Sequence, residues 1–388
     1  MIFCTVVAKS NLPLARVISR SLREHNPEAE MIVLLADTME GIDPAGEPFK
    51  MVSIEDLRMP MIRTMCFRYP KLSLTFALYP FLMTWLFSKG YESAVYIKQE
   101  SIVLGDLSPL MKMLRENSIF LTPHLIMPLK GNDSTERELT ILRAGSYNGG
   151  LVGVANDRSG RDFLSWFKDR LTTHCLLAVA EGMHYEQRWL DLVPGMFDGV
   201  LVLRDPGYNI GHWSLPERKI TAVGGRYTVD GRPLRLFRFS GYIPEDPDHL
   251  TKYTRKLRSA NLGDAAGLMR KYHNELIGAG WEKHKDIPYG FDHFDNGVPI
   301  PEIARQLYRE ENRIAERFID PFRTAGRNTF YSWLKANIWD EIYQRRKDLQ
   351  KEFPDVCGND KNVFIDWIRK HGAKEYNVRE ELLPHSGS

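Results

Sequence analysis

The side chains with the clearest chemical potential follow strand-like runs of this sequence. Lys98, Gln99 and Glu100 come directly after the run AVYI, and Arg238 lies in the late run LFRFSG. A lysine ammonium is a movable point charge, whereas an arginine guanidinium is a planar fork that fits two phosphate oxygens. The pattern therefore favours an anionic, phosphate-bearing ligand.

An alternation of strand-like and helix-like segments is expected to position these side chains. We expect strands at 2–8, 31–35, 94–97, 118–122, 150–154, 199–203 and 234–239, and helices at 12–24, 73–88, 107–115 and 160–171. Such alternation predicts an α/β domain with a mostly parallel sheet, whose ligands bind beyond the carboxyl ends of the strands. Further residues expected at those ends are Ala8, Lys9, Asn11 and Asp37.

The pattern changes after about residue 250, where strand-like runs disappear. Ile303, Leu307, Ile314 and Phe318 recur at helical spacing, and the Trp and Tyr residues that follow are expected in helix cores. The sequence therefore predicts a catalytic α/β domain at 1–250 and a helical region at 251–388. The helical region is expected to shape an acceptor site or a homo-oligomer contact.

Composition excludes several classes of protein. The 388 residues include 52 Lys and Arg and 50 Asp and Glu, and this net charge of +2 gives no reason to expect a large nucleic-acid-binding surface. The 4 cysteines form no C-x-x-C pair, which favours a reducing cytoplasm. No signal peptide or run long enough to span a bilayer is evident, so membrane contact is expected to be peripheral at most.

The stretch YESAVYIKQESIVLGDL at 91–107 resembles the centre of GT-A-fold glycosyltransferases. The resemblance is to glycogenin-like family 8 enzymes and a related bacterial surface-glycan branch, in which the text is close to YLDPDILVLGDL. The segments YNGGL at 147–151, EQRWLDLVP at 186–194 and FRFSG at 237–241 match in the same order. Together the matches cover roughly the first 250 residues.

The resemblance implies a role for each matched segment. Asn148 and Gly149 would lie beside the donor sugar, with Glu186 and Gln187 on its far side. The base and ribose of the nucleotide would contact residues near the first strands, namely Ala8, Lys9, Asn11 and Asp37. The partners implied are a UDP- or GDP-sugar and a glycan acceptor, for which weaker candidates are His124, Tyr208, Asn209 and His212.

The metal ligands of the family are replaced in this sequence. The two aspartates that hold Mg²⁺ or Mn²⁺ in the family are Lys98 and Glu100 here, and the late histidine is Arg238. Because Lys and Arg have no acceptor for a divalent ion, no metal or other cofactor is expected. We hypothesise that Lys98 and Arg238 neutralise the diphosphate leaving group, with Lys252 as a further phosphate contact. Glu100 would hold Lys98 in place or bind ribose.

Each candidate also has a plain structural interpretation. Lys98 could be a solvated lysine, Arg238 a structural ion pair, and Asn148 with its glycines a tight turn. Glu186 could be a helix N-terminal residue, or instead a general base or a charge that stabilises an oxocarbenium-like state. Asp37 could cap a helix. For the acceptor candidates, loop or core packing is the alternative.

The sequence therefore predicts transfer of a hexosyl or related sugar to a hydroxyl of a glycan such as a bacterial surface polysaccharide. Resemblance implies retention at the anomeric carbon, although Glu186 acting as a base would give inversion. An inactive homologue that serves as a binding or scaffold subunit is the main rival. No G-x-G-x-x-G follows the first strand and no G-x-x-x-x-G-K-[ST] occurs, which argues against a dehydrogenase and a nucleotide-triphosphate hydrolase.

Overall fold

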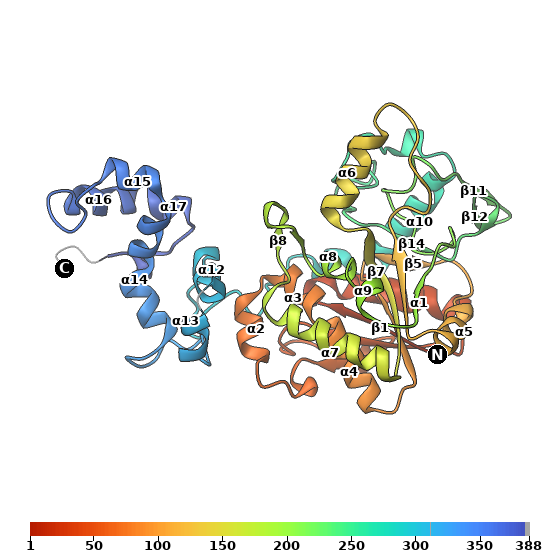
Figure 1. Ribbon diagram of the computed structural model, residues 1–388, viewed down its shortest axis with the longest axis horizontal. Helices are drawn as coiled ribbons and strands as arrows, with labels where there is room; N and C mark the ends of the chain where they lie inside the picture. Colours follow the sequence, from red (N-terminus) through yellow and green to blue (C-terminus); the bar gives the residue numbers. More distant parts are fainter. Residues whose placement is uncertain (311, 385–388) are drawn as a thin grey trace. The chain divides into compact units, whose positions relative to one another are not determined.

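The computed structural model describes residues 1–310 and 312–384. Its contacts divide the chain into two compact units, one of residues 1–58 and 71–289, the other of residues 59–70 and the chain from 290 onward (Figure 1). The first unit is α/β and the second is helical, as the sequence predicts. The two units are described separately.

A seven-stranded sheet forms the centre of the α/β unit, in the order β10-β6-β7-β4-β1-β2-β3. All of its pairings are parallel except those of β7, which runs antiparallel to β4 and β6. Its strands are β1 (Ile2–Val7), β2 (Glu30–Leu35), β3 (Lys50–Ser53), β4 (Ser93–Ile97), β6 (Ile119–Pro123), β7 (Tyr147–Ala155) and β10 (Val200–Val202).

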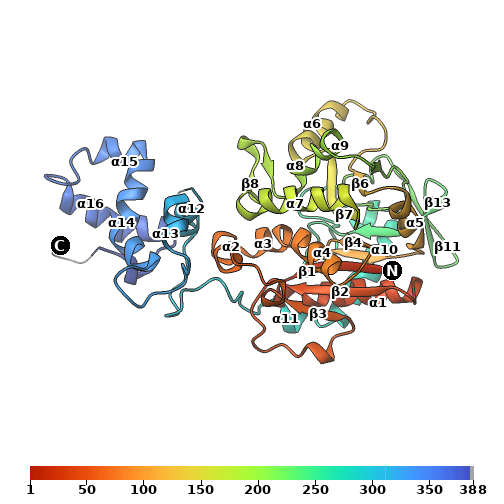
Figure 2. The ribbon, with the colours of Figure 1, turned by 60° about the horizontal axis from the view of Figure 1, so that its bottom comes forward.

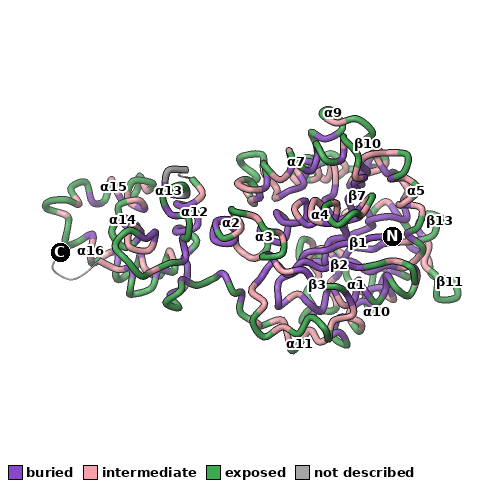
Figure 3. The backbone as a smooth tube through the Cα atoms, turned by 90° about the horizontal axis from the view of Figure 1, so that it is seen from below, coloured by how far each residue is buried: buried purple, intermediate pink, exposed green. Residues whose placement is uncertain are grey.

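Helices cover this sheet, and the strands are correspondingly apolar. All six residues of β1 are buried, and Figure 3 shows the central strands as the most buried part of the unit. Figure 2 shows α7 and α3 above the sheet and α11 below it. The helices are α1 (Leu12–His25), α3 (Lys71–Ala77), α4 (Tyr79–Ser88), α5 (Ser108–Glu116), α6 (Ser134–Ala144), α7 (Arg158–Thr173), α8 (Gln187–Leu190), α9 (Val193–Met196), α10 (Ala265–Gly278) and α11 (Trp281–His284).

Two details differ from the predicted elements. The helix expected at 73–88 is two helices, α3 and α4, because Pro80 in the first turn of α4 has no N–H to continue a preceding helix. The strand expected at 234–239 is β14 (Leu236–Arg238), which pairs antiparallel with β5 (Ser101–Val103) outside the central sheet. This pairing places Arg238 directly opposite Ser101, three residues from Lys98.

Smaller sheets were not predicted. A three-stranded sheet contains β11 (Ile220–Val223), β12 (Arg226–Val229) and β13 (Arg232–Pro233), and a short hairpin contains β8 (Leu177–Ala178) and β9 (Met183–His184). Their strands have four residues or fewer, which is too short for a periodic pattern to mark them. The β9 strand leads directly to Glu186 and α8.

The division between the units does not fall at residue 250. The segment 251–289 belongs to the α/β unit, where α10 packs on α1 through buried residues such as Leu268, Met269 and Tyr272. Conversely, residues 59–70 with α2 (Ile62–Arg68) belong to the helical unit. Helical periodicity marks a helix but does not show which core its apolar face joins.

The helical unit is held together by an aromatic cluster and a buried arginine. Phe67 contacts Tyr308, Phe322 and Phe330, and the guanidinium of Arg305 donates to the Cys66, Phe67 and Tyr69 carbonyls. Ile303, Leu307, Ile314 and Phe318 are buried, as their spacing predicts. The remaining helices are α12 (Glu302–Glu310), α13 (Asn312–Arg317), α14 (Phe330–Arg345), α15 (Lys347–Glu352), α16 (Lys361–Trp367) and α17 (Ala373–Glu375).

Candidate active site

A buried ion pair lies where β4 ends. The Lys98 ammonium donates to Glu186 Oε1 at 2.6 Å, and the two side chains are only 4% and 1% exposed. The Phe76 ring covers the ammonium, with 3.2 Å from Nζ to the ring centroid. Burial lowers the pKa of Lys98, while the neighbouring Glu186 carboxylate opposes that shift. Lys98 is therefore not a solvated surface lysine.

The glycines of the YNGG segment let the chain approach this pair closely. The Lys98 amide donates to the Gly150 carbonyl at 2.9 Å, which joins the end of β4 to β7. A methyl group at Gly149 would stand 2.4 Å from Glu186 Oε1, closer than atoms can approach. Gly149 lies within β7 and has no positive φ, so close packing, and not the tight turn considered as an alternative, explains glycine at this position.

Arg238 enters the same site from β14. Its Nη1 donates to Asn148 Oδ1 at 2.8 Å, and its Nε is 3.9 Å from Glu100 Oε2. The guanidinium carbon lies 5.8 Å from the centroid of the Trp213 ring. Nε is buried and has no hydrogen-bond partner among the described residues. Arg238 is thus the less compensated of the two cations.

Glu100 does not hold Lys98 in place, which is one of the two roles expected for it, because Glu186 is the ion-pair partner of Lys98. The Glu100 carbonyl accepts from the Phe239 amide at 2.7 Å, so this residue is tied to the end of β14. Its carboxylate accordingly lies beside Arg238, while Glu186, from the start of α8, pairs with Lys98. The sequence did not indicate this pairing, because the two residues are 88 positions apart in the chain.

Asn148 is the hub of a neighbouring polar network. Its Nδ2 meets His124 Nε2 at 2.8 Å, and its Oδ1 accepts from Asn209 Nδ2 at 3.1 Å as well as from Arg238. His212 packs edge-on against Trp213, with ring centroids 5.3 Å apart. Three of the acceptor candidates therefore lie around Arg238.

Tyr208, the fourth acceptor candidate, does not join this network. It belongs to the main apolar cluster, and the Arg235 guanidinium lies over its ring at 5.6 Å. Gln187 reaches the site through its Oε1, which accepts from the Gly149 amide at 3.4 Å, while its Nε2 donates to the Ala144 carbonyl.

The residues expected at the nucleoside lie beyond the ends of β1 and β2. The Lys9 amide donates to Asp37 Oδ2 at 3.2 Å, and Lys9 Nζ is 3.8 Å from Asp37 Oδ1. Asn11 Nδ2 donates to Gln99 Oε1 at 3.1 Å, which joins this region to the end of β4. Ala8 is fully buried. The polar members of this set are therefore brought together.

Two further cations stand at this edge. Lys252 is exposed, and its Nζ lies 5.6 Å from the centroid of the Tyr253 ring. Lys71, at the start of α3, donates to Ser10 Oγ at 3.0 Å and was not singled out in the sequence. Phe76 and Tyr185 were also missed, since an aromatic residue in an apolar run carries no sign of what it faces.

The donor set does not suit a divalent ion. Lys98 and Arg238 offer no lone pair to a metal, and Glu100 and Glu186 are each engaged with one of these cations. Among residues 1–310 and 312–384, no group of three or more His, Cys, Asp or Glu side chains could hold a metal ion.

Replacing Gly149 with alanine should reduce the rate of the sugar transfer predicted from the sequence by about 10²-fold, because displacing a reacting group by about 1 Å lowers a rate by about that factor. The added methyl group would push Glu186 away from Lys98. Gly195→Ala is the matched control, since a methyl group there meets nothing within 4 Å. Equal turnover rates for the two variants would contradict this role for the glycine.

The two site histidines make the α/β unit sensitive to acid. Burial lowers the pKa of His124 to about 3 and that of His212 to about 4, and Arg238 adds to both shifts. An unfolded histidine binds its proton near pH 6.5, so stability is lost as pH falls from there towards these values, by about 1.4 kcal/mol per pH unit for each histidine. The free energy of unfolding, measured with urea, should depend less steeply on pH for His124→Gln than for the exposed control His174→Gln. Identical slopes would contradict this assignment.

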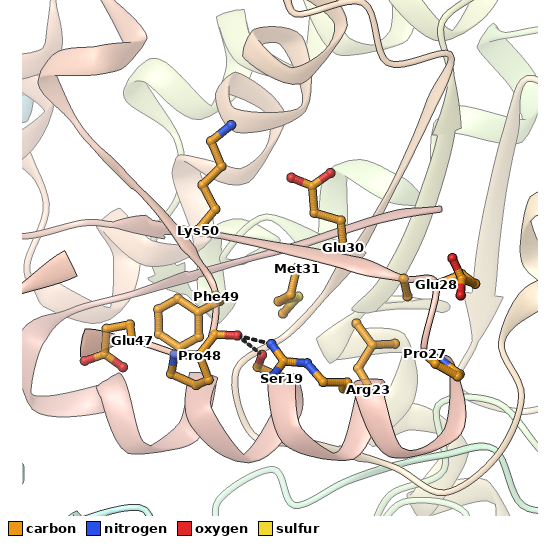
Figure 4. Close-up of a pocket in the computed structure, with 12 residues that line it drawn as sticks. Ser19, Arg23, Pro27, Glu28, Glu30, Met31, Glu47, Pro48, Phe49 and Lys50 are labelled. Carbon is orange, nitrogen blue, oxygen red and sulfur yellow. Dashed lines mark hydrogen bonds between the residues drawn. The ribbon is translucent and has the colours of Figure 1, made fainter. Parts of the chain in front are cut away.

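Two cavities lie away from this site. The larger, of about 590 Å³, is lined by α1, by the start of β2 and β3, and by the segment before β3 (Figure 4). There Ser19 Oγ and Arg23 Nη2 both donate to the Pro48 carbonyl. The second, of about 410 Å³, includes Tyr147 and Arg204 in its wall. Neither contains Lys98, Glu186 or Arg238.

No family model matches the chain. Two similar proteins come from Bacillus subtilis strain 168. The protein YfnF is 26% identical over 249 residues, which cover 62% of this chain and 81% of YfnF. The protein YfnD is 24% identical over 264 residues, which cover 65% of this chain and 82% of YfnD.

The similar solved structures include glycosyltransferases. The galactosyltransferase LgtC, in complex with donor and acceptor sugar analogs, has a TM-score of 0.45 and 12% identity, covering 72% of this chain and 96% of LgtC. The glycosyltransferase GlyE of Streptococcus pneumoniae TIGR4 has a TM-score of 0.41 and 12% identity, covering 76% of this chain and 66% of GlyE.

None of the helices among residues 1–310 and 312–384 has the length and apolar character that a membrane span requires.

Proposed function

We propose that this protein is a glycosyltransferase that moves a hexosyl or related sugar from a UDP- or GDP-sugar to a hydroxyl of a glycan. Four segments similar to those of GT-A-fold enzymes support this proposal, because their side chains meet in one site. The observation that carries it is Arg238, whose buried Nε has no hydrogen-bond partner among the described residues and lies in the same site as Lys98 and Glu186.

The proposed reaction breaks the bond between the anomeric carbon and the diphosphate, and forms one between that carbon and the acceptor oxygen. Negative charge grows on the departing diphosphate, and fixed cations aimed at it lower the barrier. Arg238 would bind two phosphate oxygens through its planar guanidinium, and the positive charge of Lys98 would further stabilise the diphosphate. Glu186, held by Lys98, would stabilise positive charge on the sugar or take the acceptor proton.

These cations would serve in place of a divalent ion. Lys98 is held in a close ion pair with Glu186, whereas Arg238 lies 3.9 Å from Glu100. A bound diphosphate would therefore rely on Arg238, which forms no close ion pair, and on the exposed Lys252 at the edge of the site.

The test is turnover of UDP- and GDP-sugars, as hydrolysis and as transfer, in buffer that contains EDTA. We expect turnover to persist when EDTA is present and to gain little from Mn²⁺. A strict requirement for Mn²⁺ would contradict the metal-independent mechanism. Tight binding of a nucleotide sugar without turnover would instead favour the inactive, scaffold-type homologue.

A further inference from the structure

Tyr253 presents an aromatic face to solvent while its ring is held in place. The side chain is 63% exposed, and its ring packs edge-on against His212 with centroids 5.4 Å apart and planes at 89°. The ring also lies against the backbone of Gly241, where a methyl group would stand 2.6 Å from Tyr253 Cε2. An exposed but immobilised ring is a preorganised surface for stacking.

Tyr185 directly precedes Glu186 and has a strained backbone conformation. Its φ of 51° lies in the left-handed region, which costs a residue other than glycine on the order of 1–3 kcal/mol. The ring packs against Phe76 at 5.2 Å, and Glu186 follows directly in the chain. Burial raises the pKa of Tyr185 to about 12, and the nearby Tyr253 phenol adds to this shift.

Polar groups without partners lie near the two tyrosines. Glu186 is fully buried, yet its Oε2 has no hydrogen-bond partner among the described residues. The same holds for His212 Nε2, on the residue that supports the Tyr253 ring. A buried oxygen left without a partner is costly, which points to a ligand that donates a hydrogen bond to it.

We infer that Tyr253 and Tyr185 form the binding site for the acceptor, a pyranose ring that stacks on the exposed face of Tyr253 and directs a hydroxyl to Glu186. A pyranose has an apolar face of C–H groups and a rim of hydroxyls, and this matches an aromatic surface beside a carboxylate. The acceptor role rests on the proposed function, because it requires a donor sugar at the same carboxylate.

A nucleotide base is the other planar ligand that could stack on Tyr253. The polar residues expected at the nucleoside, Lys9, Asn11 and Asp37, are instead joined to one another and to Gln99 beyond β1 and β2. Because the polar groups suited to a nucleoside lie at that other position, the exposed tyrosine is assigned to the acceptor.

The experiment compares the full-length protein with Tyr253→Ala, Tyr253→Phe and the control Tyr91→Ala. Tyr91 is partly buried before β4 and donates to Glu30 at the opposite end of the sheet. Saturation-transfer NMR would measure the binding of methyl hexosides, maltose and lactose. Calorimetric titration with UDP and GDP on the same samples would report the nucleotide site.

We expect Tyr253→Ala to weaken saccharide binding by about tenfold more than nucleotide binding, whereas Tyr253→Phe keeps the stacking face and most of the affinity. Equal saccharide affinity in Tyr253→Ala and the wild type, or no saccharide binding at all, would overturn the inference. A selective loss of UDP or GDP binding would overturn it too, by assigning the ring to the base. Failure of the proposed function would appear separately, as a wild-type protein that binds neither nucleotide.

Discussion

Replacing Arg238 with alanine is expected to lower the rate of sugar transfer by about 10²–10³-fold, the cost of removing one preorganised group that stabilises developing negative charge. The reason lies in its geometry, because Arg238 is anchored by Asn148 while its buried Nε has no hydrogen-bond partner among the described residues. Glu100 at 3.9 Å orients the guanidinium without forming a close ion pair. The measurement is steady-state transfer in EDTA.

Two further variants make this result specific. Arg238→Lys keeps the charge but removes the planar fork, and it should retain only part of the rate. Arg235→Ala is the matched control, since this arginine lies on the same segment but is directed to the Asp106 carbonyl and the Tyr208 ring. If Arg238→Ala and Arg235→Ala transferred sugar equally well, Arg238 would not stabilise the leaving group.

Replacing Lys98 with methionine should destabilise the α/β unit by about 3–5 kcal/mol, the cost of leaving one member of a buried ion pair without its partner. Glu186 would then be a buried carboxylate with no cation beside it. The double variant Lys98→Met with Glu186→Leu should recover most of that stability, because both charges are gone, but it should not transfer sugar. Urea unfolding measures the first effect, and the transfer assay measures the second.

The exposed residue Lys89 supplies the control for this cycle. Its ammonium lies over the Trp85 ring at 5.0 Å and belongs to no ion pair described in the structure. Lys89→Met should therefore unfold at nearly the wild-type urea concentration. A double variant no more stable than Lys98→Met alone would show that the two side chains are not coupled.

The central strands and their carboxyl ends were predictable because they are local features. The runs at β1, β2 and β4 are apolar on both faces, as strands covered by helices must be, and Lys98 follows β4 as expected. The helical C-terminal region was also evident, since Ile303 and Leu307 repeat at a helical interval and are buried. These inferences need only residues that are neighbours in the chain.

The details of the site depend on residues far apart in the chain. Nothing within the segment 186–194 indicates that Glu186 meets Lys98, because α8 is only four residues long and the hairpin before it has two-residue strands. The β5–β14 pairing that brings Arg238 to Ser101 likewise joins two three-residue strands. The conformation of Tyr185 has no signature in the sequence, since left-handed backbone is most often found at glycine.

The most direct test is a crystal structure of the protein with a bound UDP- or GDP-sugar, grown with Mn²⁺ present. We predict the diphosphate oxygens within hydrogen-bonding distance of the Arg238 guanidinium, the Lys98–Glu186 pair beneath the sugar, and no metal ion bridging the phosphates. A manganese ion coordinated by the diphosphate and Glu100, or a nucleotide whose phosphates lie far from residues 98 and 238, would contradict the mechanism.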